Sequence, residues 1–256
     1  MKHLFNLTFL LLSALVLLFI VIPLVGLFGG VGWSALFTAF RDAEIMGSVW
    51  LTMKVSFYGT CLILVTGLPL AYLIARHDFR GKSFVESLID IPVMLPHTAA
   101  GIALLVAFNR GVMDDIFKSL GIRIVDTEAG IMIAMMFLSA PFLINGAKEG
   151  FKNVDPKLEN VARTLGAGRF AVFFRVVLPN ARREIVNGML MMWSRGLGEF
   201  GAVVIIAYHP MVAPVLIYDR FNNYGLTYSA PVAAVMIAVS LSTFLLVRWV
   251  NNRKRV

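Results

Sequence analysis

Residues 161–179 of this 256-residue chain read VARTLGAGRFAVFFRVVLP, a basic and amphipathic stretch within an otherwise apolar sequence. Apolar residues recur at helical spacing on both sides of a Gly-Ala-Gly break, and a Leu-Pro pair closes the stretch. The stretch also carries Arg163, Arg169 and Arg175. It is therefore predicted to lie outside the lipid, although long apolar runs precede and follow it.

The composition around this stretch is that of a membrane protein. Hydrophobic residues make up 59% of the chain, charged residues make up 15%, and the mean hydropathy is +0.80. Because soluble domains carry about a quarter charged residues, we expect lipid rather than water to cover most of the surface. The one cysteine, Cys61, excludes an internal disulfide and a multi-cysteine metal site.

Six apolar stretches approach the length of about 20 residues that a helix needs to cross ~30 Å of hydrocarbon. They predict an all-α integral membrane protein with six transmembrane helices, organised as a single domain over residues 1–256. The first stretch is too long for a signal peptide and is followed by no cleavage site. The predicted spans are 4–28, 47–75, 91–108, 129–147, 185–207 and 226–249.

The positive charges indicate an orientation, because cytoplasmic loops are enriched in Lys and Arg. Sixteen of these residues lie on the side of the two termini, and five lie on the opposite side. The net charge of +8 is then a topology signal, which removes the nucleic-acid interpretation. We expect a multi-pass protein of the cell membrane, with both termini and a basic loop at about 148–183 in the cytoplasm.

This loop is predicted to contain two short amphipathic helices. The first begins at Asp155-Pro156, where the aspartate caps the helix and the proline occupies its first turn. It ends before Gly166, which stands at the position of a left-handed C-terminal cap. Its apolar face, at the spacing i, i+3, i+4, i+7, is Leu158, Val161, Ala162 and Leu165.

The second helix follows Ala167-Gly168 and is predicted to end at Leu178-Pro179, since proline cannot continue a helix interior. Its apolar face is formed by Phe170, Phe173, Phe174 and Val177. Two interpretations fit the pair of helices. They lie on the bilayer surface, or they dock into a groove of another protein.

The spacing within the loop resembles a known motif. Importer-type ABC permeases carry Glu-Ala-Ala, three residues, Gly, nine residues and Ile-x-Leu-Pro in a cytoplasmic loop. Here Asn160-Val161-Ala162 is followed after three residues by Gly166 and after nine more by Val176-Val177-Leu178-Pro179. The first two positions differ from the motif, and a glutamate stands one residue earlier, at Glu159.

The resemblance implies a type I ABC importer permease, in which a coupling helix docks into a cytoplasmic ATPase subunit and passes its motion to the membrane helices. The chain has no phosphate loop of its own, so it is expected to be a transport subunit and not an enzyme. The residues implied to couple it to the ATPase are Leu158, Glu159, Asn160, Val161, Ala162, Arg163, Thr164, Leu165, Gly166, Ala167 and Gly168, with Leu178 and Pro179 ending the motif.

Two further stretches resemble the oxyanion branch of these permeases, PVMLPHTAAGIALL at 92–105 and RGLGEFGAVVIIA at 195–207. The continuation YHPMVAPVLIYDRF at 208–221 is similar to archaeal molybdate/tungstate permeases. The resemblance implies import of molybdate or tungstate, with sulfate or thiosulfate as the alternative. It also implies a second copy of the chain, two ATPase subunits, and an external oxyanion-binding protein received by loops near 112–128 and 208–228.

Candidate pathway residues come from the third and fifth predicted spans. Arg195 and Glu199 share a helix face, either as a structural ion pair or as a pair at the pathway or the dimer interface. His97 either lines the pathway or is a packed or surface histidine. The G-x-G-x-x-G match that ends at Gly201 lacks the βαβ unit of a nucleotide site. Since small residues in spans permit close helix approach, Gly201 joins the interface candidates.

Two other classes are weaker alternatives. A secondary transporter driven by an ion gradient would often show internal repeats with broken helices at matching positions, and no clear repeat occurs in this sequence. A membrane enzyme would need a nucleophile with its base or paired carboxylates, and no such constellation stands out. No cofactor and no cluster of metal ligands is indicated.

Overall fold

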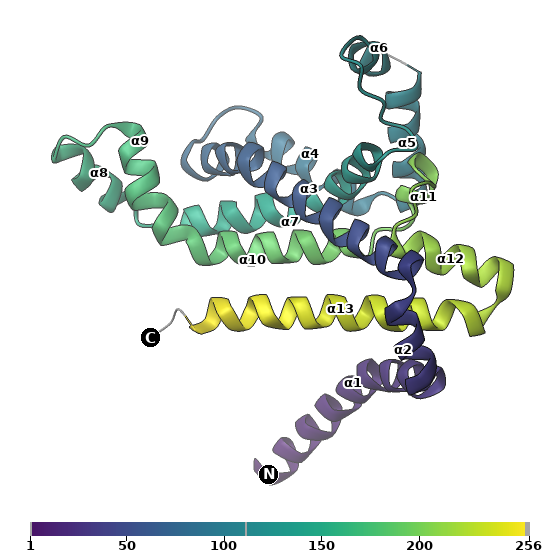
Figure 1. The fold of residues 1–256 in the computed structure, drawn as a ribbon. Coiled ribbons are helices and arrows are strands. Elements are labelled where there is room, and N and C mark those ends of the chain that lie inside the picture. The colour runs from purple at the N-terminus through teal and green to yellow at the C-terminus, as the bar shows by residue number, and fades with distance from the viewer. Residues whose placement is uncertain (1, 111, 254–256) are drawn as a thin grey trace.

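The computed structural model describes residues 2–110 and 112–253, and within them every regular element is a helix (Figure 1). Lys254 and Arg255, which contribute to the predicted cytoplasmic charge, lie outside these residues. The helices are α1 (Lys2–Val31), α2 (Trp33–Arg41), α3 (Ala43–Arg76), α4 (Lys82–Met94), α5 (His97–Asn109), α6 (Val112–Ser119), α7 (Glu128–Asn153), α8 (Pro156–Thr164), α9 (Arg169–Val172), a π-helical turn (Phe173–Val177), α10 (Leu178–Leu197), α11 (Val203–Ile206), α12 (Ala213–Tyr224) and α13 (Leu226–Arg253).

Four helices in the described residues are long and apolar enough to cross a membrane: α1, α3, α7 and α13. They contain the first, second, fourth and sixth predicted spans. The third predicted span is broken at Leu95-Pro96, where α4 and α5 meet at 111°. A residue before proline is pushed out of helical geometry, which accounts for the position of the bend. Counted as one span, the bent pair raises the number to five.

The fifth predicted span, 185–207, is also not one helix. It falls on α10, which ends at Leu197, and on the short α11, which begins at Val203. α10 is more polar than a lipid-facing helix and packs along α7 and α3, so part of its surface faces protein. The total of six transmembrane helices therefore stays a prediction.

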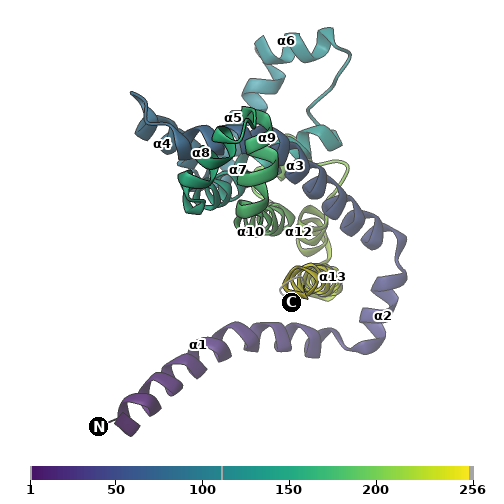
Figure 2. The ribbon, with the colours of Figure 1, turned by 90° about the vertical axis from the view of Figure 1, so that its left-hand side faces the viewer.

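The centre of the molecule is a bundle of α3, α7 and α10, which lie side by side in both ribbon views (Figures 1 and 2). α7 and α10 approach closely at a pair of glycines, since a Cβ built on Gly146 would lie 2.9 Å from Gly188 Cα. Small residues let helix backbones come together in this way. α12 and α13 pack against each other beside the bundle.

α1 stands apart from the bundle (Figure 2). The most apolar window of its candidate span has no buried residue, although the span is 26 residues long. A helix of this length and composition requires lipid or another protein around it. The structure thus fits a multi-pass membrane protein.

The two ends of the bundle carry different segments. α8 and α9 lie at one end of the α7–α10 pair, whereas α6, α11 and α12 lie toward the other end (Figure 1). The segment around residues 156–172 is therefore separated by the length of α7 and α10 from the segments that surround residues 112–128 and 208–228. The amphipathic loop and the two predicted receiving loops therefore lie at opposite ends of the bundle.

Candidate functional site

α8 forms as its sequence predicts. The Asp155 side chain accepts a hydrogen bond from the Lys157 N–H at 2.9 Å, and Pro156 occupies the first turn. At the other end Gly166 has a φ of +87°, a left-handed value that glycine adopts without strain. The Gly166 N–H bonds to the Arg163 carbonyl and the Ala167 N–H to the Ala162 carbonyl, which is a Schellman cap. The predicted start and end of this helix are confirmed.

The loop is shorter than predicted, and its second helix does not end where expected. α7 runs to Asn153, and α9 continues through the π-helical turn directly into α10. Ending that helix at Leu178-Pro179 was therefore wrong. In a regular α-helix the ring of Pro179 would clash with the carbonyl of Arg175. The wider turn at Phe173–Val177, with its i to i+5 bonds, lets the chain pass this point without a break.

The apolar side of α8 faces outward. Leu165 is 83% exposed, and the two apolar residues on the same side of α8 are also exposed. Phe170, at the start of α9, is 83% exposed as well. Contiguous exposed apolar side chains mark interaction surfaces. We call this set the outer apolar face; its residues are Leu158, Val161, Leu165, Phe170 and Phe174.

Glu159, by contrast, is turned into the protein. It is 4% exposed, and its Oε1 lies 2.7 Å from Arg76 Nε at the end of α3. Its Oε2 accepts a hydrogen bond from the Tyr72 hydroxyl at 3.0 Å and lies 3.5 Å from Arg163 Nη2. α8 thus buries its one acidic residue and exposes most of its apolar residues, whereas an ordinary surface helix buries its apolar side. Of the predicted apolar face, Ala162 alone packs inward against the core.

Most of the remaining residues of the predicted coupling segment are on the surface. Asn160, Arg163 and Thr164 are on α8 and do not reach the core, apart from the Arg163 contact described above. Ala167 packs against the core below the turn, while Gly168 begins α9. The structure therefore keeps the predicted segment together as one helix and one turn, with two distinct sides.

The candidate pathway residues His97, Arg195 and Glu199 meet in one cluster. Arg195 Nη1 donates to Glu199 Oε2 at 3.0 Å, and Arg195 Nη2 lies 2.7 Å from His97 Nε2. His97 Nδ1 lies 3.2 Å from the same Glu199 oxygen, and the Ala202 N–H donates to the other at 3.0 Å. The Glu199 side chain is 1% exposed, whereas Arg195 and His97 reach the surface.

The chemistry of arginine sets the direction of the Arg195–His97 contact. Arginine has no acceptor, so His97 Nε2 must be the acceptor for Arg195. His97 Nδ1 lies 3.3 Å from the same Arg195 nitrogen and 3.2 Å from Glu199 Oε2, so the ring contacts both charged partners. The arginine and glutamate charges cancel, and the exposed parts of the cluster are one imidazole edge and one guanidinium edge.

The cluster joins the two places where the apolar stretches are broken. His97 begins α5 immediately after the α4–α5 bend, and Glu199 follows the end of α10. Gly201 packs on His97, and a Cβ at that position would lie 2.7 Å from the His97 Cβ. The contact requires glycine. Gly201 therefore belongs to the same cluster as the other three predicted residues.

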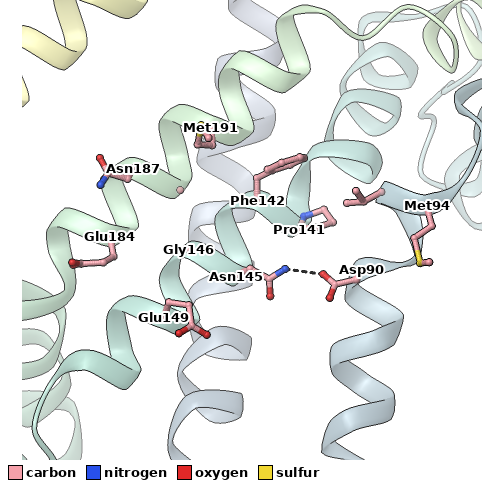
Figure 3. Close-up of a pocket in the computed structure, with 12 residues that line it drawn as sticks. Asp90, Met94, Pro141, Phe142, Asn145, Gly146, Glu149, Glu184, Asn187 and Met191 are labelled. Atoms are coloured by element: carbon pink, nitrogen blue, oxygen red, sulfur yellow. Dashed lines mark hydrogen bonds between the residues drawn. The ribbon is translucent and has the colours of Figure 1, made fainter. Parts of the chain in front are cut away.

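A groove of about 550 Å³ opens between α4, α7 and α10 (Figure 3). Its floor is crossed by a hydrogen bond of 2.7 Å from Asn145 Nδ2 to Asp90 Oδ1. Met191, which lines the groove, lies on α10 one turn before Arg195. The labelled residues that line it are Asp90, Met94, Pro141, Phe142, Asn145, Gly146, Glu149, Glu184, Asn187 and Met191.

Several contacts were not found from the sequence. Arg76 was counted only among the basic residues that indicate the orientation in the membrane. No role was predicted for Tyr72 or Asp90. Lys54 pairs with Glu128 on α7 at 2.7 Å. The available signal was the presence of charged residues near the ends of apolar helices, where burial is costly unless a partner is present. Which partner each one finds depends on helix packing that a single sequence does not encode locally.

Residues 67–256 match the family model described as "Binding-protein-dependent transport system inner membrane component". The matched region includes α8, the outer apolar face and the cluster. The chain belongs to this family of ABC importer permeases. Such a permease is a transport subunit rather than an enzyme, and its family description names the binding protein on which transport depends.

Among curated proteins, this permease is similar to molybdate/tungstate transport system permease proteins of archaea. The Pyrococcus furiosus protein is 41% identical over 95% of this chain and 94% of its own length. That of Methanocaldococcus jannaschii is 35% identical over 91% and 92%. A probable sulfate transport system permease protein of Chlorokybus atmophyticus is 32% identical over 74% and 68%.

Solved structures support the permease fold. A bacterial ABC transporter involved in the import of the acidic polysaccharide alginate matches with a TM-score of 0.76 at 19% identity, covering 100% of this chain and 98% of that chain. The inward-facing MetNI methionine ABC transporter matches with a TM-score of 0.62 over 82% and 93%. These structural matches confirm the type I importer architecture expected from the sequence. Because the identities are below 20%, they are evidence for the fold alone.

Proposed function

We propose that this permease imports molybdate or tungstate into the cytoplasm as part of an ATP-driven complex. The observation that carries the proposal is the 41% identity to a molybdate/tungstate permease along nearly the whole chain. We further propose that two copies of the chain form the path, that two ATPase subunits bind on the cytoplasmic side, and that an external oxyanion-binding protein delivers the substrate. An importer driven by an ion gradient does not fit the family.

The outer apolar face is the proposed docking surface for the ATPase. Leu165 and Phe170 expose apolar area, whereas Glu159 of α8 is turned inward. A helix lying on the bilayer would also expose apolar residues. The spacing of the motif around Gly166 and the family membership favour docking, because an importer permease must receive motion from a separate ATPase.

The proposed orientation places this face and both termini in the cytoplasm. In Figure 1 the C-terminal end of α13 points to the side on which α8 and α9 lie, and the N-terminal end of α1 is directed to that side as well. The excess of Lys and Arg on the same side supports this assignment. α6 and α12 are then external and are proposed to receive the binding protein.

Arg195 and His97 are proposed to line the anion path at the interface between two copies, with Glu199 and Gly201 holding them in place. Bonds to Glu199 and His97 use two of the five N–H donors of the Arg195 guanidinium. Its side chain is 28% exposed, so the remaining part can face an oxyanion. Arginine suits this task because it stays charged and binds oxyanions through paired N–H groups.

Replacement of Arg195 by glutamine should lower molybdate import at least tenfold, about the effect of losing one charged hydrogen bond to an anion. Arg195→Lys keeps the charge and should retain more import than Arg195→Gln. The measurement is initial import in proteoliposomes, with the amount of assembled complex determined for each variant. Equal import by wild type and Arg195→Gln would remove Arg195 from the path.

Uptake of labelled molybdate tests the proposed function. This chain would be reconstituted in proteoliposomes with the ATPase and binding protein encoded beside it. We expect uptake that requires ATP and that is blocked by excess tungstate but not by sulfate. Equal competition by sulfate would shift the substrate to sulfate, which the 32% identity to a sulfate permease makes the second candidate. Uptake without the ATPase would contradict the proposal.

A further inference from the structure

The contact between α8 and α3 is a buried ionic one. Arg76 Nε and Glu159 Oε1 lie 2.7 Å apart, and their side chains are 11% and 6% exposed. Arg76 Nη2 also donates to the Val154 carbonyl at 2.8 Å, just before α8 begins. One arginine at the end of α3 thus holds both the chain that leads into α8 and the first turns of α8 itself.

Tyr72 completes this set from α3. Its hydroxyl donates to Glu159 Oε2 at 3.0 Å. Its ring packs edge-on against Phe151 at 5.5 Å and Phe173 at 5.0 Å between centroids. The aromatic contacts fix the hydroxyl in position, so Glu159 meets one fixed hydrogen-bond donor and one guanidinium charge on α3.

Stability alone does not explain why the chain places charges here. A well-packed apolar pair often holds two buried surfaces together as firmly as an ion pair, because ions lose their hydration on burial. Apolar residues are available, since α8 turns Leu158, Val161 and Leu165 outward. What the polar contacts add is direction, because the Tyr72 hydroxyl bond to Glu159 and the Arg76 Nη2 bond to the Val154 carbonyl fix the position of α8 on α3.

α3 connects this contact to the candidate pathway. It belongs to the central bundle, and its Ser56 hydroxyl donates to the Trp193 carbonyl of α10 at 3.0 Å. Trp193 lies two residues before Arg195 on the same helix. A displacement of α8 that is passed to α3 therefore reaches the helix that carries Arg195 without travelling along the intervening sequence.

We propose that Glu159, Arg76 and Tyr72 are positioning residues that transmit the movement of α8 to α3 during transport. This inference rests on the proposed function, in which the ATPase moves α8. Glu159 does not form part of the docking surface, because it is buried beneath the helix and faces α3. Weakening the link should leave the ATPase bound and active while the membrane helices follow it less efficiently.

The test compares import with ATP hydrolysis in the complete complex. Glu159→Gln keeps the shape of the side chain and removes its charge. We expect the ATPase to co-purify as in wild type and ATP hydrolysis to continue, while molybdate imported per ATP falls at least about fivefold, the lower end of typical coupling between sites. Tyr72→Phe removes one hydroxyl and should change the ratio in the same direction by a smaller factor.

Asp78→Asn is the matched control. Asp78 is also a cytoplasmic carboxylate near the end of α3, but its side chain is 99% exposed and it pairs with Lys82 four residues further along. Its removal should leave the ratio unchanged. A second control combines Glu159→Gln with Arg76→Gln. If the two residues act as one link, the double variant should be no worse than the more impaired single variant.

Three results would overturn the proposal. They are a wild-type ratio in Glu159→Gln, loss of the ATPase from that variant, and single effects that simply add in the double variant. If Glu159→Gln does not reach the membrane, the amount of molybdate imported per ATP is measured in Tyr72→Phe instead. A wild-type value in that variant would reject the link. Failure of the proposed function has a different signature, because wild-type protein would then show no ATP-dependent molybdate import at all.

Discussion

Replacement of Leu165 by glutamate is expected to separate the ATPase from the permease. Leu165 is 83% exposed at the end of α8, so the permease itself should fold and insert as before. A central apolar residue of an interface contributes about 2 kcal/mol or more, which is roughly a 30-fold change in affinity. A buried, unpaired carboxylate adds a further penalty. Co-purification of the ATPase with the tagged permease would measure the loss, and ATP-dependent import should disappear with it.

The control for this variant is Phe79→Glu. Phe79 is an exposed apolar residue in the loop between α3 and α4, and it lies outside the outer apolar face. The Phe79→Glu variant introduces the same charge on the same side of the membrane, and the ATPase should remain bound to it. If both variants, or neither, lose the ATPase, the outer apolar face is not the docking surface.

Replacement of Gly166 by valine is expected to uncouple ATP hydrolysis from import. At a φ of +87° a β-branched residue is strained by about 1–3 kcal/mol. The chain can relieve this strain only by opening the cap of α8, which alters the angle at which α8 and α9 meet. Import per ATP should fall at least about fivefold, as for other coupled sites. Insertion into the membrane should be unaffected, since Gly166 lies outside the bundle.

Gly168 provides a close comparison for this variant. It lies two residues further along, its φ is −67°, and a Cβ there would meet no atom within 4 Å. Gly168→Val should therefore keep a near wild-type ratio. Normal coupled import in Gly166→Val, or equal damage in both variants, would show that the left-handed turn is not what matters at this position.

The sequence predicts α8 well because the signals are local. An aspartate followed by proline begins the helix, and a glycine at the right distance ends it. These residues act through bonds to their own neighbours, so no knowledge of the rest of the fold is needed. For Gly201 the sequence predicts only that a small residue lies within a span. Its contact with His97 could not be predicted, because His97 belongs to a distant segment of the chain.

The inward position of Glu159 could not be predicted in this way. Both interpretations of the sequence place the apolar residues of α8 against lipid or a partner, but Glu159 lies inside because Arg76 and Tyr72 are there. The helix end expected at Pro179 fails for a related reason, since the π-helical turn removes the clash that local rules assume. Residues 91–108 were predicted as one span, whereas the chain bends by 111° between α4 and α5, an angle that depends on the packing of both helices.

Fold and substrate have different determinants in this family. An alginate importer has the same fold at 19% identity, so the architecture does not select molybdate or tungstate. The substrate assignment depends on the much higher identity to archaeal permeases and on the external binding protein that the family requires. Within the structure, the Arg195–His97 edge is the proposed place of contact with the anion.

The most direct test of the central claim is crosslinking from the outer apolar face. Leu165→Cys, in a chain whose Cys61 is replaced by serine, would carry a short photoreactive group in the assembled complex. We expect a crosslinked product between the permease and the ATPase subunit in the assembled complex. This product should be lost when the ATPase is left out. Crosslinking to lipid in both cases, with none to the ATPase, would mean that α8 and α9 lie on the bilayer surface and would contradict the account.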